Sequence, residues 1–184
     1  MDEIVNAILI DEFYTDNDCA IKLWSGFRVL SVDRSSITLP ITKELKRIYG
    51  ETKNQTNTII VQARASVLYD VLNHYVLDGI LSPKDIGERA LALGNLSNCK
   101  EKDLIIYDRG YPAYDFIYEH CSRGLEYLMR CKVSFSGVTK AFIDSGKISQ
   151  IVELYPGKNV PVTEKQYDRD TPIKVRLLRI ELPS

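Results

Sequence analysis

The sequence predicts an α/β protein in which helices flank a mixed β-sheet. Two runs rich in β-branched and aromatic residues, 59–69 and 75–81, predict strands, and their short connection predicts an antiparallel hairpin. Two more apolar runs, 28–33 and 103–108, each end in an aspartate. Helical segments follow the hairpin, so strands and helices both contribute to the fold.

Three segments carry helical patterns. Residues 1–26 predict a helix followed by a polar turn. Residues 82–96 predict a helix with Ser82 as N-cap and Pro83 in its first turn. Its expected buried face consists of Ile86, Ala90, Leu93 and Leu96.

The third helix is expected at 113–123, where Gly124 is placed to end it. Residues 125–131 then predict another strand, and 148–155 and 173–182 predict two short strands near the end of the sequence. The polar segment 40–57 predicts a long surface excursion.

Composition limits the possible functions. The 184 residues are 45% hydrophobic and 27% charged, which is typical of a globular protein with a core. The formal net charge is −1, so any DNA binding requires a local basic patch or a segment outside this sequence. The acidic N-terminus is unlike a signal peptide, and no apolar stretch is long enough to cross a membrane.

These features predict a cytoplasmic protein without a membrane partner. Its cysteines are then expected to be free thiols, and their spacing excludes the usual zinc motifs. They are Cys19, Cys99, Cys121 and Cys131.

Asp33 and Asp108 are the candidate catalytic residues, since each closes a short apolar run. If the two strands lie side by side and parallel, their carboxylates meet at one edge of the sheet. Two such carboxylates suit a hard cation such as Mg²⁺. The alternative is structural, because an aspartate after a strand is often a turn former or a helix N-cap.

Four blocks, in order, resemble the DDE transposases of bacterial insertion sequences, in the group named after insertion sequence four. The first-aspartate motif of that group is similar to residues 28–40, RVLSVDRSSITLP. The second-aspartate motif, with its Asp-Arg-Gly-Tyr core, matches residues 104–111, LIIYDRGY. Between them, 62–72 and 82–96 resemble the stretches that follow the first motif. The likeness is strong from Trp24 to Lys132.

The resemblance implies a ribonuclease H-like catalytic core at 1–132, and at 133–184 the start of a β-rich insertion. It implies that Asp33 lies on the first strand and Asp108 at the end of a neighbouring strand, together holding Mg²⁺ or Mn²⁺ for DNA cleavage and strand transfer. The implied partner is the DNA of transposon ends. Self-association or pairing with full-length transposase is a further expectation.

Two departures from the family pattern change these expectations. Arg34 follows the first aspartate where the family usually has glycine, which would add a cation close to the metal site. The family's third acid, a glutamate in a Tyr-x-x-Arg-x-x-x-Glu motif, is not found, and Glu153, Glu164 and Glu181 lie in β-prone or turn segments. We therefore expect a truncated, inactive catalytic fragment.

Four residues are candidates for nucleic-acid binding. Arg109 and Tyr111 flank the second aspartate and could contact the phosphate backbone, or Tyr111 could pack beside Pro112. Arg64 and Lys132, with Arg130, could line the same face, although charged residues on strands are more often simply solvated.

Alternative functions follow from the same residues. The chain could be a non-enzymatic remnant that binds DNA or full-length transposase, or a disused gene product without activity. A phosphoryl-transfer domain with Asp33 as nucleophile is disfavoured, because Ser35 stands where haloacid-dehalogenase-like phosphatases have a second aspartate.

Overall fold

The structure is a computed structural model that describes residues 2–16, 20–163 and 165–180, with side chains described from residue 8 onward. The chain divides into two compact units. Unit 1 comprises Met1–Ile106 and Leu125–Tyr127, and unit 2 comprises Tyr107–Gly124 and Leu128–Ser184. In the described part of the chain, no helix is both long and apolar enough to cross a membrane.

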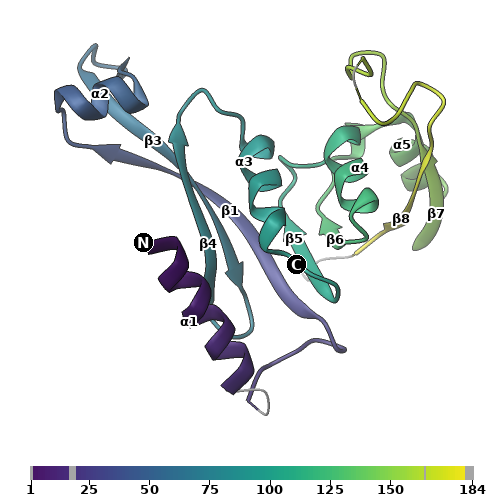
Figure 1. Cartoon of the computed structure of the whole chain (residues 1–184). Helices are drawn as coiled ribbons and strands as arrows, with labels where there is room; N and C mark the ends of the chain where they lie inside the picture. Colours follow the sequence, from purple (N-terminus) through teal and green to yellow (C-terminus); the bar gives the residue numbers. More distant parts are fainter. Residues whose placement is uncertain (1, 17–19, 164, 181–184) are drawn as a thin grey trace. The chain divides into compact units, whose positions relative to one another are not determined.

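A mixed sheet forms the centre of unit 1 (Figure 1). Its strand order is β2-β3-β1-β5-β6, and β4 also pairs with β3. The β1 and β5 strands are parallel, whereas β3 is antiparallel to β1, β2 and β4. The bounds are β1 (Arg28–Leu39), β2 (Thr52–Lys53), β3 (Ile59–Asp70), β4 (Tyr75–Pro83), β5 (Asp103–Tyr107) and β6 (Glu126–Met129).

Several predicted strands are confirmed, but β1 corrects the prediction at Asp33. The strand does not end there, because the polar residues after it keep pairing with β3 as far as the pair Leu39↔Val61. Backbone hydrogen bonds sustain a strand whatever its side chains, so an apolar run marks only the buried part of β1. The predicted surface excursion at 40–57 likewise contains α2 (Lys43–Tyr49) and β2.

The helix predicted from residue 82 begins later. Ser82 pairs with Arg64 and Pro83 with Ala63, so both belong to β4, and α3 (Glu88–Asn95) starts after Gly87. The N-cap prediction at Ser82 was wrong because the strand pairing continues through it.

The later start also changes the buried face of α3. Of the four residues expected there, only Leu96 is buried, and it lies just beyond the helix. The α3 residues that pack on the sheet are Leu91, Ala92 and Asn95. Asn95 donates a hydrogen bond to Ser66 Oγ on β3 at 2.9 Å, which fixes the face of the sheet that α3 covers.

The N-terminal helix α1 (Asp2–Asp16) confirms the predicted first helix and lies along β4 in Figure 1. Phe13 stacks on Tyr75 of β4, with ring centroids 4.7 Å apart. The Tyr14 hydroxyl donates to the buried Asp70 carboxylate at 2.5 Å, and Arg28 lies over the Tyr14 ring. The predicted polar turn after the helix falls partly on residues 17–19, outside the described residues.

Unit 2 contains α4 (Tyr114–Ser122), α5 (Gly137–Asp144) and the antiparallel pair β7 (Ser149–Leu154) and β8 (Ile173–Leu178). The third predicted helix and both late strands are confirmed, and Gly124 follows α4 with φ +65°, as a C-terminal glycine should. The sequence did not predict α5, which contains Gly137 and β-branched residues. It is held by the Ser136 cap, whose Oγ accepts from Thr139 N at 3.1 Å, and by the buried Phe142.

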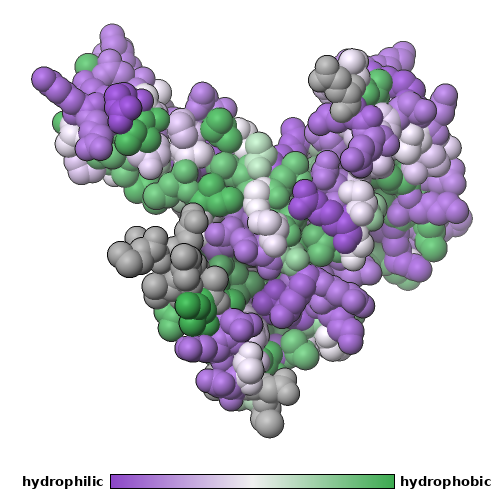
Figure 2. All heavy atoms as spheres, viewed as in Figure 1, coloured by the Kyte–Doolittle hydropathy of each residue, from purple (hydrophilic) through white to green (hydrophobic). Residues whose placement is uncertain are grey.

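Aromatic rings form the core of unit 2. Tyr107, Tyr111, Phe116 and His120 contact one another, with His120 Nε2 2.9 Å from the Tyr107 hydroxyl. The Tyr114 hydroxyl donates to the Thr171 carbonyl at 2.7 Å and so ties α4 to the segment before β8. In Figure 2, hydrophilic residues cover most of the visible surface of this unit.

Candidate functional site

The β1 strand, which contains Asp33, and the β5 strand, which precedes Asp108, are parallel neighbours, as the family resemblance implied. Their register runs from Arg28↔Asp103 to Ser31↔Ile106. Asp33 lies two residues beyond this register on β1, and Asp108 follows β5 directly. Asp33 belongs to unit 1 and Asp108 to unit 2.

Asp33 lies on the face of the sheet opposite α3. Side chains alternate along a strand, and Arg34 shares its face with Ser66, the residue that α3 contacts through Asn95. Asp33 therefore points the other way, where its carboxylate is exposed. Among the described residues, no hydrogen bond or ion pair engages this carboxylate.

Arg34 forms an ion pair with Glu88 of α3, with Nε and Oε1 2.7 Å apart. The arginine therefore lies on the face of the sheet that α3 covers, whereas the interpretation that it adds a cation close to the metal site stays a prediction.

Asp108 is an exposed carboxylate in a cationic neighbourhood. Its side chain is 69% exposed, and Arg130 Nη1 lies 3.9 Å from Oδ1, with the Arg130 side chain 66% exposed. A contact of this length between solvated groups holds neither side chain firmly. The Asp108 carboxylate is therefore available to a stronger cation.

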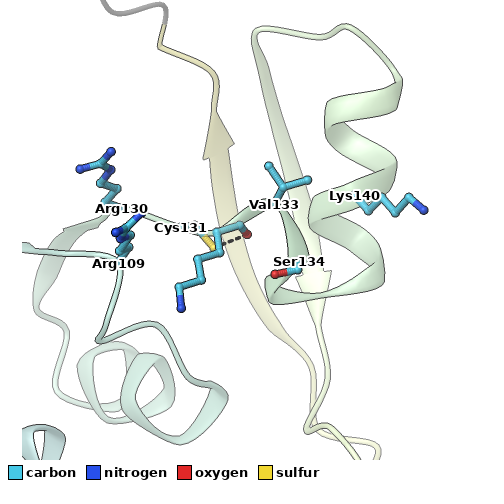
Figure 3. Close-up of a pocket in the computed structure, with 7 residues that line it drawn as sticks. Arg109, Arg130, Cys131, Val133, Ser134 and Lys140 are labelled. Carbon is cyan, nitrogen blue, oxygen red and sulfur yellow. Dashed lines mark hydrogen bonds between the residues drawn. The ribbon is translucent and has the colours of Figure 1, made fainter.

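Arg109 and Lys132, both predicted to bind nucleic acid, line one pocket of unit 2 (Figure 3). The pocket has a volume of about 510 Å³. Arg130 lines it too, and Lys140 joins it from α5, the helix that sequence reasoning missed.

The other two candidates are placed differently. Tyr111 is only 4% exposed and packs against Tyr107 and Phe116, which favours the packing interpretation over a phosphate contact. Arg64 belongs to β3 in unit 1, where its guanidinium donates to the carbonyl of Ile86 in the segment before α3.

Two exposed carboxylates are a suitable donor set for Mg²⁺, which keeps several water ligands and often takes only one or two carboxylates from the protein. Within the described ranges, no group of three or more His, Cys, Asp or Glu side chains is arranged to hold a metal ion. Among the described cysteines, Cys131 is an exposed free thiol, while Cys19 lies outside the described residues.

A mixed sheet with parallel β1 and β5, an antiparallel hairpin and flanking helices defines an α/β protein of the ribonuclease H-like kind. Comparison with protein families identifies its relatives more closely. The transposase DDE domain matches residues 24–169, more than half of the chain, and the chain belongs to this family. No curated protein matches the sequence significantly. Membership of the family indicates a role in transposition.

Proposed function

We propose that the chain is catalytic-domain sequence of an insertion-sequence-four type transposase, and that Asp33 and Asp108 are its first two metal-binding acids. The observation that carries the proposal is the family match across 24–169, which spans both aspartates together with their motifs. The parallel register of β1 and β5 supports it, because residues of the two motifs pair with each other from Val29↔Leu104 to Ser31↔Ile106.

The two carboxylates would hold Mg²⁺ or Mn²⁺ through oxygen atoms, and both are exposed enough to accept it. When bound, the metal would activate a water or a 3′-hydroxyl at a phosphodiester and stabilise the leaving oxygen. Asp108 would exchange its long contact with Arg130 for the metal, which frees the guanidinium for another anion.

We further propose that the chain by itself does not cleave DNA, because the third acid of the family is missing from its sequence. Glu153 lies on β7, exposed and hydrogen-bonded to the Tyr155 hydroxyl, and Glu164 and Glu181 lie outside the described residues. In this proposal, 1–132 is the catalytic core, 133–184 begins the β-rich insertion, and the protein acts in the cytoplasm on transposon ends.

A second candidate function is a non-enzymatic fragment that binds DNA or full-length transposase. The basic pocket of unit 2 favours it, because the pocket residues need neither a metal nor a third acid to attract a phosphate. The two candidates differ in whether metal binding depends on the aspartates.

Calorimetric titration with Mn²⁺ and Mg²⁺ tests the leading proposal. We expect the wild-type chain to bind metal, and Asp33→Asn and Asp108→Asn each to abolish binding. Asp85→Asn is the matched control, since Asp85 is an exposed acid in the segment before α3. Binding that survives both aspartate substitutions would contradict the proposal, and absence of binding in the wild type would favour the non-enzymatic function.

A further inference from the structure

The basic pocket of unit 2 carries an inference beyond the two aspartates. Among the described residues, its lining contains four cationic side chains and no carboxylate. The seven lining residues are Arg109, Arg130, Cys131, Lys132, Val133, Ser134 and Lys140.

Short, well-anchored segments present these side chains. Arg109 lies in the turn that follows β5, and the Arg130 backbone N–H donates to the Tyr107 carbonyl at 3.0 Å. Lys132 then leads into η2 (Val133–Phe135), which contacts α5. The wall of the pocket is thus fixed by backbone contacts, while the charged ends of its side chains remain solvated.

The arrangement of the cations is visible in Figure 3. In this view, the Arg109 and Arg130 side chains lie on the same side of the pocket. Lys140 extends from α5 and points away from the two arginines, so it contributes to the rim.

Positive charge is concentrated in the unit that holds the pocket. By sequence, unit 2 carries 12 Lys and Arg against 9 Asp and Glu, a formal charge of +3. Unit 1 carries 12 against 16, a formal charge of −4. A net charge of −1 for the whole chain therefore conceals a basic region, which is the local patch that DNA binding requires.

The pocket cations are also poorly neutralised. In the described part of unit 2, the only ion pair made by a pocket residue joins Arg130 to Asp108 at 3.9 Å. Arg109, Lys132 and Lys140 keep their charge for an external anion. Guanidinium groups bind phosphate oxygens in a bidentate manner, lysine acts as a point charge, and the Ser134 hydroxyl is a further donor.

We propose that this pocket binds consecutive phosphates of a nucleic-acid backbone and so guides the strand past Asp108. The inference rests on the proposed function, which supplies the polymer, but the pocket does not depend on metal. Contacts to phosphates carry no sequence information, so the pocket would position the strand without selecting its sequence.

Fluorescence anisotropy with a labelled duplex of arbitrary sequence, in EDTA, tests the proposal without metal chemistry. The test variant is Arg109→Gln/Lys132→Gln, and the control is Lys147→Gln/Lys158→Gln, which removes the same charge from exposed positions of unit 2 outside the pocket. We expect the test variant to bind at least ~10-fold more weakly than the control. Its plot of log affinity against log salt should be shallower by about 2, because each lost phosphate contact removes about 0.9 from the slope.

Equal affinities and salt slopes for the two double variants would overturn the proposal. Displacement of the duplex by inorganic phosphate at constant ionic strength would also overturn it, since the pocket would then bind a free phosphate. The anisotropy assay in EDTA does not depend on the metal site. The pocket variant could therefore weaken DNA binding while metal binding proves independent of Asp33 and Asp108. That result would refute the proposed metal site and leave the proposed phosphate pocket standing.

Discussion

The two units of the chain use their charged residues in opposite ways. Unit 1 buries one charged pair, Arg28 with Asp103, whereas unit 2 leaves four cations solvated around a pocket. Buried pairs hold a fixed geometry because breaking them leaves an unsatisfied charge, and solvated cations contribute little to stability but remain available to a ligand. The comparison distinguishes a buried pair that holds its own geometry from exposed cations that an external anion can reach.

The largest expected effect is on the buried pair of unit 1. Arg28 and Asp103 form two hydrogen bonds of 2.8 and 2.7 Å, and their side chains are 8% and 1% exposed. Arg28→Ala should lower the free energy of unfolding by about 3–5 kcal/mol, because Asp103 would stay buried without its cation. Urea denaturation followed by circular dichroism measures the loss.

The matched double variant Arg28→Met/Asp103→Leu should recover much of that stability, since it removes both charges together. If Arg28→Ala lowers the free energy of unfolding by less than about 1 kcal/mol, the pair behaves like a surface ion pair. That result would contradict the contrast drawn between the two units.

The next effect concerns pH and the core of unit 2. His120 is fully buried, and burial lowers its pKa below the ordinary value of 6.5. The folded protein then resists protonation of His120, while the unfolded chain accepts the proton near pH 6.5. The free energy of unfolding is therefore highest above that pH and decreases as the pH is lowered further. The expected slope is up to ~1.4 kcal/mol per pH unit for the one proton taken up on unfolding.

Urea midpoints between pH 7.5 and 5 measure this slope, above the range where most carboxylates titrate. His120→Gln should flatten the profile, whereas His74→Gln, at the exposed hairpin turn, should leave it unchanged. A wild-type profile that stays flat down to pH 5 would contradict the role given to His120.

A smaller effect is expected where α1 joins the sheet of unit 1. Tyr14→Phe keeps the ring over which Arg28 lies but removes the hydrogen bond to Asp70. Asp70 retains bonds from the backbone of Leu72 and Asn73 and from the Asn73 side chain, so we expect a loss of about 1–2 kcal/mol rather than unfolding. Hydrogen exchange should show faster exchange in α1 than in β3, and equal exchange rates would contradict this local docking.

The sequence predicted the strands of this fold well where apolar runs coincide with buried pairing, as in β3 and β5. The predicted strand ends were wrong where backbone pairing continues beyond the apolar residues. The β1 strand continues past Asp33, and β4 continues through Ser82. Local capping signals cannot reveal that a neighbouring strand is still forming hydrogen bonds. The short helix α5 was missed for a related reason, because its cap and the burial of Phe142 stabilise it more than its helix propensity does.

The candidate site was predictable only in part. The family motifs marked Asp33, Asp108 and Arg109 in the sequence, and Lys132 was suggested as a charge on the same face. The contribution of Lys140 to the pocket needed the fold, because α5 brings it there from a segment without any motif. Arg34 is a second example. Its place next to Asp33 in the sequence suggested a position near the metal site. In the structure, side chains alternate along β1, and Arg34 faces Glu88 of α3.

The smallest expected effect tests that assignment of Arg34. Its ion pair with Glu88 is solvated, with side chains 44% and 29% exposed, so Arg34→Ala should change stability by less than ~1 kcal/mol. Because Arg34 and Asp33 point to opposite faces of β1, the same substitution should leave the calorimetric Mg²⁺ affinity unchanged within twofold. Glu88→Gln is the matched control, because it breaks the same pair from α3 and leaves β1 intact. Tighter metal binding in Arg34→Ala but not in Glu88→Gln would contradict this assignment, because the Arg34 charge would then act on the Asp33 carboxylate.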